Sequence, residues 1–213
     1  MTGVVTLHDY WRSSAAYRVR IALNLAGISY RAVPVDLLKG EHRSPAYLAL
    51  NPQGLVPVLQ IDGLVLTQSV AIIEYLMDSA KASFLPPDPA GRARCRALAY
   101  AVAMEIAPIG NLSVRRYAEE ISGGAVSADQ WQARFIARGL AALESLLDHP
   151  ATGLYCHGDQ ITLPDLCLVP QLYNARRVGV DLSAMPRITA ISAALQAVPG
   201  VAAAHPDRVR PTG

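Results

Sequence analysis

Cysteine is scarce in this chain, and its spacing argues against two kinds of site. The 213 residues include three cysteines, Cys95, Cys156 and Cys167. None forms a C-x-x-C pair, and an odd number at irregular spacing argues against a disulfide framework. The spacing also lacks the pattern of a zinc site, so we expect no bound metal and free thiols that are buried or half-buried.

Long apolar runs and clusters of one charge are also missing. No stretch approaches the roughly 18 uncharged apolar residues of a membrane helix, and His8, Asp9 and Arg12 interrupt any signal-peptide core. The 19 basic and 17 acidic residues give a net charge of +2 without a basic block, which argues against nucleic-acid binding. We therefore expect a cytoplasmic protein with no membrane or nucleic-acid partner.

The N-terminal part of the chain has a β-α-β pattern. With 52% hydrophobic and 17% charged residues, the chain is expected to form a packed globule. Strand patterns at residues 4–10 and 30–37 flank a helical pattern that Ser13 or Ser14 caps and Gly27 ends. The right-handed crossover rule makes these strands parallel. Pro34 removes one donor from the second strand, which favours an edge position.

A hairpin and a helix are predicted next, before the composition changes. Asp62-Gly63 between two apolar runs is a strong hairpin signal. Thr67 or Ser69 can cap a helix over residues 70–78. The three prolines of residues 84–91 predict a linker.

Beyond the linker the patterns are almost entirely helical. Thr162 and Asp165, three residues apart, predict a capping box at the start of a helix over residues 163–178. We expect an α/β domain at residues 1–82, a linker at 83–90 and an all-α domain at 91–213.

Residues 11–20, WRSSAAYRVR, place two serines at the start of the first predicted helix. An N-cap side chain accepts a hydrogen bond from an amide of the first turn, which explains one hydroxyl. The second hydroxyl needs another explanation. Free amides at a helix N-terminus, together with a hydroxyl, are suited to stabilising an anion.

An α/β domain followed by an all-helical one resembles the glutathione transferases. Motifs similar to those of the zeta class run from about residue 5 to about residue 183: RSSAAYRVRIAL, ALNPQGLVPVL, QSVAIIEYL, NLSV and DLCLVPQLYNARR. The resemblance implies a thioredoxin-like first domain, glutathione as cofactor and a homodimer. It also implies a glutathione-dependent cis-trans isomerase that converts maleylacetoacetate to fumarylacetoacetate by reversible thiolate addition.

The resemblance assigns the chemistry of the thiol to the serine pair. The glutathione thiol has a pKa of about 8.5 if it behaves like cysteine, so only a few per cent is thiolate at pH 7. Lowering that pKa by about two units requires roughly 2.7 kcal/mol of anion stabilisation. The family pattern favours Ser13 as the activating residue, while Ser14 would cap or support.

The rest of the tripeptide has further expected partners. Val56 would present its main chain to the cysteinyl part, next to a cis Pro57. Gln68 and Ser69 would hold the γ-glutamyl carboxylate at a helix start. His42 occupies the position that contacts the glycyl end in relatives, although a loop histidine is often simply solvated.

The substrate is expected to be a small diacid. Arginine binds carboxylates bidentately, and Arg12 and Arg177 are the candidates. Asn111 and Ser113 match family positions that line the same cleft, and Asn111 also belongs to the expected glutathione contacts.

One departure from the zeta pattern leaves the substrate open. Ala15 stands where zeta-class members usually have cysteine, and relatives that act on maleylpyruvate also lack this cysteine. NLSV, however, lacks the extra arginines of those enzymes, which favours maleylacetoacetate. A maleylpyruvate isomerase, a transferase acting on haloacids, and a non-catalytic glutathione-binding or interaction protein remain alternatives.

Overall fold

The computed structural model describes residues 4–79 and 81–211. Internal contacts divide the chain into two units, one formed by residues 1–83 and 198–213 and the other by residues 84–197. The change at residue 83 lies where the linker is expected to begin. Residues 198–211 differ from the expectation, because they pack with the first unit and not with the helical one.

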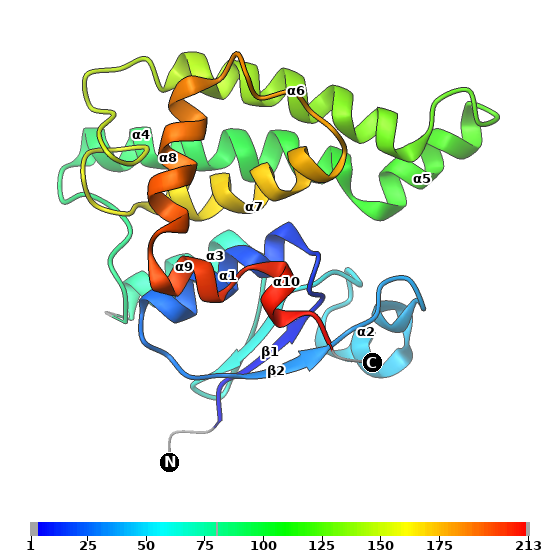
Figure 1. The fold of residues 1–213 in the computed structure, drawn as a ribbon. Helices are drawn as coiled ribbons and strands as arrows, with labels where there is room; N and C mark the ends of the chain where they lie inside the picture. Colours follow the sequence, from blue (N-terminus) through cyan, green and yellow to red (C-terminus); the bar gives the residue numbers. More distant parts are fainter. Residues whose placement is uncertain (1–3, 80, 212–213) are drawn as a thin grey trace. The chain divides into compact units, whose positions relative to one another are not determined.

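A four-stranded mixed sheet forms the centre of the first unit. The strands are ordered β2-β1-β3-β4, and their bounds are Thr6–Asp9 (β1), Arg31–Pro34 (β2), Val58–Ile61 (β3) and Leu64–Thr67 (β4). The β1–β2 pair is parallel, whereas β1–β3 and β3–β4 are antiparallel. The predicted parallel pair and the edge position of the strand with Pro34 are thus confirmed, together with an α/β unit (Figure 1).

The described residues of this unit also form six helices. They are α1 (Ser14–Leu25), η1 (Glu41–Arg43), α2 (Pro45–Leu50), α3 (Ser69–Asp78), α9 (Pro199–Ala203) and α10 (Pro206–Val209). Both α3 and α9 pack on α1, and Figure 1 shows the red C-terminal segment beside the blue helix. Every residue of α1 from Ala16 to Leu23 is buried, which makes this helix the core element of the unit.

Local signals predicted the hairpin correctly and the start of α3 incorrectly. Asp62 and Gly63 both have positive φ, 52° and 78°, as a type I′ turn requires. Neither Thr67 nor Ser69 caps α3: Ser69 is its first residue, and the N-cap is Gln68, whose side chain makes no capping bond. The Ser69 side chain instead accepts from Arg18, a contact described below.

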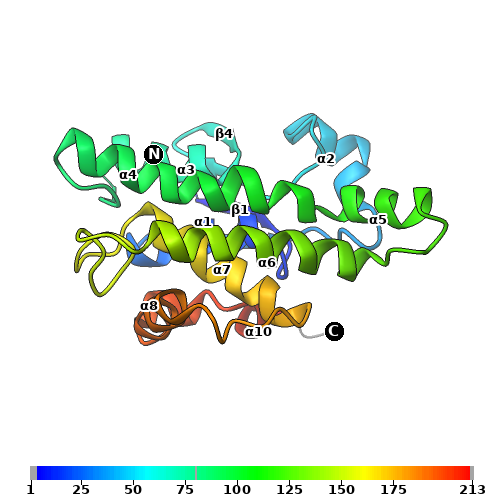
Figure 2. The same cartoon turned by 90° about the horizontal axis from the view of Figure 1, so that it is seen from above.

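The second unit is helical, as expected. Its elements are α4 (Pro89–Tyr100), the π-helical η2 (Ala101–Ile106), η3 (Pro108–Gly110), α5 (Leu112–Ile121), α6 (Ala128–Leu146), α7 (Leu163–Arg177) and α8 (Pro186–Gln196). Helices α5 and α6 pack together and are joined by a loop at one end of the unit (Figure 2). The π-helical turn of η2 starts at Ala101 and ends at Ile106, before Pro108 opens η3.

Two local features fix the helices of this unit. The predicted capping box at the start of α7 is present, and the Asp165 carboxylate accepts from the Thr162 amide at 2.8 Å and its hydroxyl at 2.9 Å. A Cβ added at Gly139 of α6 would overlap with the side chain of Ile106 in η2. Glycine therefore permits the close packing of α6 on η2.

Within the described residues, no single helix combines the length and apolarity needed to cross a membrane. The consecutive segments Pro89–Gly110 and Leu112–Ile121 meet that test only when counted together, and they are bent by 47°.

Candidate functional site

The N-terminus of α1 presents a hydroxyl and two amides. Ser13 is the N-cap, and its Oγ accepts from the amide of Ala16 at 3.2 Å. In the described part of the chain, the amides of Ser14 and Ala15 have no hydrogen-bond partner. A hydroxyl has one proton and two acceptor sites, so the capping bond leaves the Ser13 proton available to an anion. The sequence analysis assigns capping and the activating hydroxyl to two different serines, whereas in the structure the Ser13 side chain caps α1 and still has its proton available for a second hydrogen bond.

A buried ion pair holds the bend between β1 and α1. Arg20 donates to both carboxylate oxygens of Asp9, at 2.7 and 2.8 Å, and to the carbonyl of Trp11 at 3.0 Å. It also donates to the carbonyl of Ala204 in the C-terminal segment at 3.1 Å. Burial raises the pKa of Asp9, and the charge of Arg20 opposes that rise. Arg20 thus connects three places in the chain: Asp9 at the end of β1, Trp11 just before Ser13, and Ala204 in the C-terminal segment.

Sheet pairing brings three expected binding segments to the same end of the strands in the first unit. His8 near the end of β1 pairs with Val58 at the start of β3, and Val58 pairs with Thr67 at the end of β4. The bend to Ser13 follows β1, the Val56–Pro57 segment precedes β3, and the Gln68–Ser69 segment follows β4. The topology therefore gathers the predicted thiol, peptide and carboxylate contacts.

The loop before β3 is held by side-chain hydrogen bonds that leave the main-chain groups of Val56 available for a further hydrogen bond. The Val56–Pro57 peptide bond is cis, as the resemblance implies. The Tyr47 hydroxyl and the Asn51 amide nitrogen both donate to the Leu55 carbonyl at 2.8 Å. Burial raises the pKa of Tyr47, so its hydroxyl remains a donor. Within residues 4–79 and 81–211, neither the N–H nor the C=O of Val56 has a hydrogen-bond partner.

The start of α3 combines an unusual backbone with a buried arginine. Gln68 has φ 66°, rare for a residue other than glycine, and its side-chain nitrogen donates to Gln53 Oε1 at 2.8 Å. Ser69 is buried, and its Oγ accepts from Nη1 of the buried Arg18 at 3.2 Å. Arg18 and Gln53 are residues that the sequence analysis did not assign to the site.

His42 lies against the same loop. It belongs to η1 and is half-buried, so it is not a freely solvated side chain. A Cβ added at Gly54 would lie 3.1 Å from the His42 carbonyl oxygen and 4.0 Å from its ring Cδ2. Because Gly54 has φ +62°, the loop depends on glycine here, next to the Val56–Pro57 segment.

Arg12 is exposed beside the serine pair. Its guanidinium carbon lies 4.6 Å from the centroid of the Trp11 ring, and that of Arg210 lies 5.1 Å from the same centroid. Two cations therefore contact the aromatic residue that precedes Ser13 by two positions. Arg210 was not expected at this place, because the sequence puts it in the other domain.

The remaining candidates lie in the helical unit. Arg177, the last residue of α7, donates to Oε1 of the buried Gln132 at 3.3 Å. A Cβ on Gly110, the residue before Asn111, would lie 3.1 Å from Nε2 of Gln132. Gln132 thus lies between Arg177 and the turn that carries Asn111, a link the sequence did not indicate. Ser113 is exposed on α5.

The chain's own thiols are not suited to nucleophilic chemistry. Cys95, Cys156 and Cys167 are all buried and not joined in disulfides, as expected. Burial raises the pKa of Cys95 and that of Cys156, which keeps both as thiols. Among the described residues, no group of three or more His, Cys, Asp or Glu side chains could hold a metal ion. Chemistry that needs a thiolate at α1 therefore needs a thiol from outside the chain.

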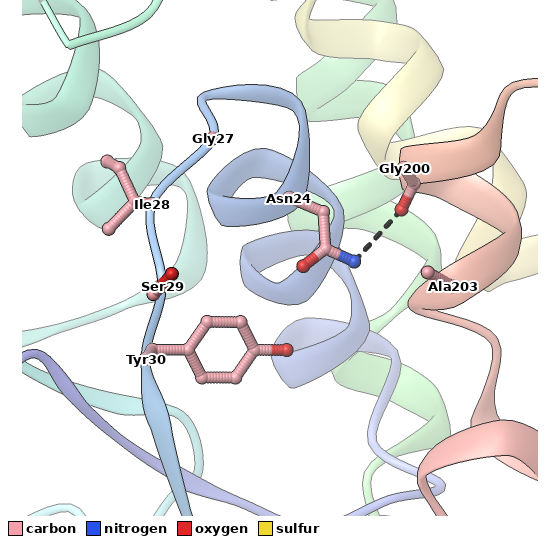
Figure 3. A pocket seen from close by; sticks show the side chains of 7 residues that line it. All are labelled: Asn24, Gly27, Ile28, Ser29, Tyr30, Gly200 and Ala203. Atoms are coloured by element: carbon pink, nitrogen blue, oxygen red, sulfur yellow. Dashed lines mark hydrogen bonds between the residues drawn. The ribbon is translucent and has the colours of Figure 1, made fainter.

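A surface pocket at the opposite end of α1 contains none of the expected site residues (Figure 3). Asn24 and Tyr30 line it, and Asn24 donates to the Gly200 carbonyl at 3.0 Å. This contact fixes α9 on α1 and adds no reactive group to the site.

Family comparisons agree with this architecture. The family model of the glutathione S-transferase N-terminal domain matches residues 3–78, and that of the C-terminal domain matches residues 125–203. The chain belongs to the glutathione S-transferase family.

This glutathione S-transferase is also similar to individual relatives over nearly its full length. Maleylacetoacetate isomerase of Rhizobium meliloti is 56% identical over 99% of this chain and 100% of its own length. A holo structure of maleylpyruvate isomerase, described as a zeta-class transferase, is 41% identical with a TM-score of 0.93, covering 98% of this chain and 100% of that one. Maleylacetoacetate isomerase of Anaeromyxobacter dehalogenans, solved with dicarboxyethyl glutathione and citrate in the active site, is 44% identical with a TM-score of 0.87, covering 99% and 98%.

The buried pair behind the serine bend gives a stability prediction. Asp9→Asn should lower the free energy of unfolding by about 3–5 kcal/mol, because the buried guanidinium of Arg20 loses its counter-charge. Asp129→Asn is the control: it breaks the 2.8 Å pair of Arg115 with an exposed carboxylate, and should cost below about 1 kcal/mol. Urea unfolding measures both, and equal losses would contradict a special role for the Asp9 pair.

Proposed function

We propose that this glutathione S-transferase is a glutathione-dependent cis-trans isomerase that converts maleylacetoacetate to fumarylacetoacetate. The observation that carries the proposal is the N-terminus of α1. There Ser13 caps the helix through its oxygen, keeps its proton to donate, and lies beside two amides without partners among the described residues. The identity of 56% with an isomerase of that name supports the substrate.

The first unit offers groups that fit each part of glutathione. The free N–H and C=O of Val56 match the main chain of the cysteinyl residue. Ser69 and the first amides of α3 match the γ-glutamyl carboxylate, and Gln68, fixed by Gln53, assists them. His42, half-buried next to Gly54, is assigned to the glycyl end.

The residues of α1 act on the thiol. Bound glutathione supplies a thiolate that adds to the conjugated double bond, permits rotation and departs unchanged. The Ser13 hydroxyl donates a hydrogen bond to the sulfur anion, and the amides of Ser14 and Ala15 add positive potential at the helix start. Roughly 2.7 kcal/mol of such stabilisation would lower the thiol pKa by about two units, enough to make thiolate abundant at neutral pH.

Arginines are assigned to the diacid. Arg12 and Arg177 bind the carboxylates, which orients the double bond and stabilises the negative charge that develops on the conjugated oxygen. Gln132 orients Arg177 through the 3.3 Å hydrogen bond. Asn111 and Ser113 are assigned to the same substrate, with Asn111 also contacting glutathione. The family further supports a homodimer that works in the cytoplasm.

Maleylpyruvate isomerisation is the second candidate. The solved structure with a TM-score of 0.93 is named for that activity, and Ala15 replaces the cysteine usual in the zeta class. Both reactions use the same serine and the same thiol, so the groups at α1 do not discriminate between them.

A product assay separates the isomerase from a transferase. Purified protein is incubated with maleylacetoacetate, maleylpyruvate or a haloacid, with and without glutathione, while the cis isomer and free thiol are followed. We expect glutathione-dependent loss of the cis isomer with full recovery of thiol, faster for maleylacetoacetate. Stoichiometric consumption of thiol would instead identify a transferase, and the absence of any turnover would revive the non-catalytic alternative.

Ser13 variants test the assigned residue. Ser13→Ala and Ser13→Gly should both lower kcat about 10- to 100-fold, because each loses the donor to the anion. The two differ in helix capping, since alanine costs about 1 kcal/mol of stability and glycine only a few tenths. Equal loss of kcat at unequal melting temperature would separate catalysis from capping. Ser14→Ala should lose less, and unchanged turnover in both Ser13 variants would remove Ser13 from its role.

A further inference from the structure

The C-terminal segment of the chain, residues 198–211, is held on α1 by two side chains of that helix. Asn24 donates to the Gly200 carbonyl at 3.0 Å (Figure 3), and Arg20 donates to the Ala204 carbonyl at 3.1 Å. Ala204 is buried, as is Val201. Packing on α1 therefore determines where the last residues of this segment lie.

Arg210 extends from this segment to the bend before Ser13. Helix α10 ends before Arg210, which has non-helical backbone angles of φ −59° and ψ 127°. Pro211 follows, and a proline disfavours the helical conformation in the residue before it. The guanidinium carbon of Arg210 lies 5.1 Å from the centroid of the Trp11 ring. Arg20 donates to the Trp11 carbonyl at 3.0 Å, so one buried side chain fixes both the C-terminal segment and the residue that Arg210 contacts.

Arg12 and Arg210 form a pair of exposed cations on one aromatic ring. The guanidinium carbon of Arg12 lies 4.6 Å from the Trp11 centroid, so the two guanidinium carbons are no farther apart than the sum of their distances to that centroid. Within residues 4–79 and 81–211, neither guanidinium has a hydrogen-bond or ion-pair partner. Two cations held this close repel each other, and an anion bound by both offsets the repulsion.

The acidic residues nearest to this pair in the sequence have other neighbours. The Asp9 carboxylate is bound by Arg20 at 2.7 Å. Asp207 of α10 has its Oδ2 at 3.7 Å from Nδ1 of His205. In the described part of the chain the pair therefore has no carboxylate of its own, and an anionic ligand would supply one.

We propose that Arg210 is a substrate-binding residue that, together with Arg12, binds the terminal carboxylate of the diacid. This inference rests on the proposed function and adds a residue that selects diacids. The carbon attacked by the glutathione sulfur must lie beside Ser13, and the carboxylate next to that carbon lies there with it. The terminal carboxylate is several carbon atoms away and can reach the exposed pair. Guanidinium groups bind carboxylates bidentately, and the Trp11 ring holds both side chains in place for this.

Two substrates make the test specific. One is maleylacetoacetate, and the other is the analogue in which hydrogen replaces the terminal carboxylate, so that the double bond and its neighbouring carboxylate are kept. Steady-state kinetics are measured for both at saturating glutathione. Arg210→Met should raise KM for the diacid about tenfold and leave its kcat within about twofold, because the lost contact is made equally in the bound substrate and in the transition state. Both constants for the analogue should stay unchanged.

Matched variants separate a direct contact from a change in overall charge. Arg208→Met removes the same charge from an exposed position of α10 and should leave all constants unchanged. Arg210→Lys keeps the charge but loses the planar fork, so its KM for the diacid should be intermediate. In Arg12→Met/Arg210→Met the two effects on KM should not simply add, because both residues bind the same carboxylate.

The outcomes distinguish this inference from the proposed function. An unchanged KM for the diacid in Arg210→Met, an equal rise for both substrates, or the same rise in Arg208→Met would each overturn the binding role and leave Arg210 as a residue that only packs on Trp11. Failure of the wild type to isomerise maleylacetoacetate would instead overturn the proposed function.

Discussion

An anion held at the N-terminus of α1 is the interaction on which the proposed chemistry depends. The helix itself is specified by ordinary rules, with Ser13 as N-cap and Gly27 beyond its end. What makes its start chemically useful is that the capping bond uses the oxygen of Ser13 and not its proton. Because all three cysteines of the chain are buried, the sulfur that benefits must come from a bound molecule.

The sheet positions the other binding segments close to the N-terminus of α1. The ends of β1 and β4 and the start of β3 lie at the same end of the strands, so Ser13 comes near segments that follow it by more than 40 residues in the sequence. Buried polar contacts then fix each segment: Arg20 holds the bend before Ser13, Tyr47 and Asn51 hold the loop before Val56, and Arg18 holds Ser69. Such contacts are costly to break, because each leaves a buried polar group unsatisfied.

Local signals in the sequence predicted much of this and missed what depends on distant partners. The parallel strands, the edge position of Pro34, the Asp62-Gly63 turn and the Thr162–Asp165 box each follow from a few adjacent residues. The Arg18–Ser69 bond joins residues 51 positions apart, and the Arg20–Ala204 bond joins residues 184 apart. No local pattern indicates either partner, so the sequence predicted neither the side-chain contact at the start of α3 nor the packing of residues 198–211 with the first unit. The resemblance to zeta-class motifs pointed to Ser13, Val56 and Ser69, whereas Arg18 and Gln132 became visible only through contacts.

The most direct test of the central claim is the ionisation of the glutathione thiol in its complex with the protein. Thiolate absorbance in the ultraviolet is titrated against pH for the wild type and for Ser13→Ala, each saturated with glutathione. The wild type should show a thiol pKa about two units below the free value of about 8.5, and Ser13→Ala should return it toward that value. A bound thiol that titrates at its free value in the wild type, or at the same lowered value in both proteins, would contradict the account.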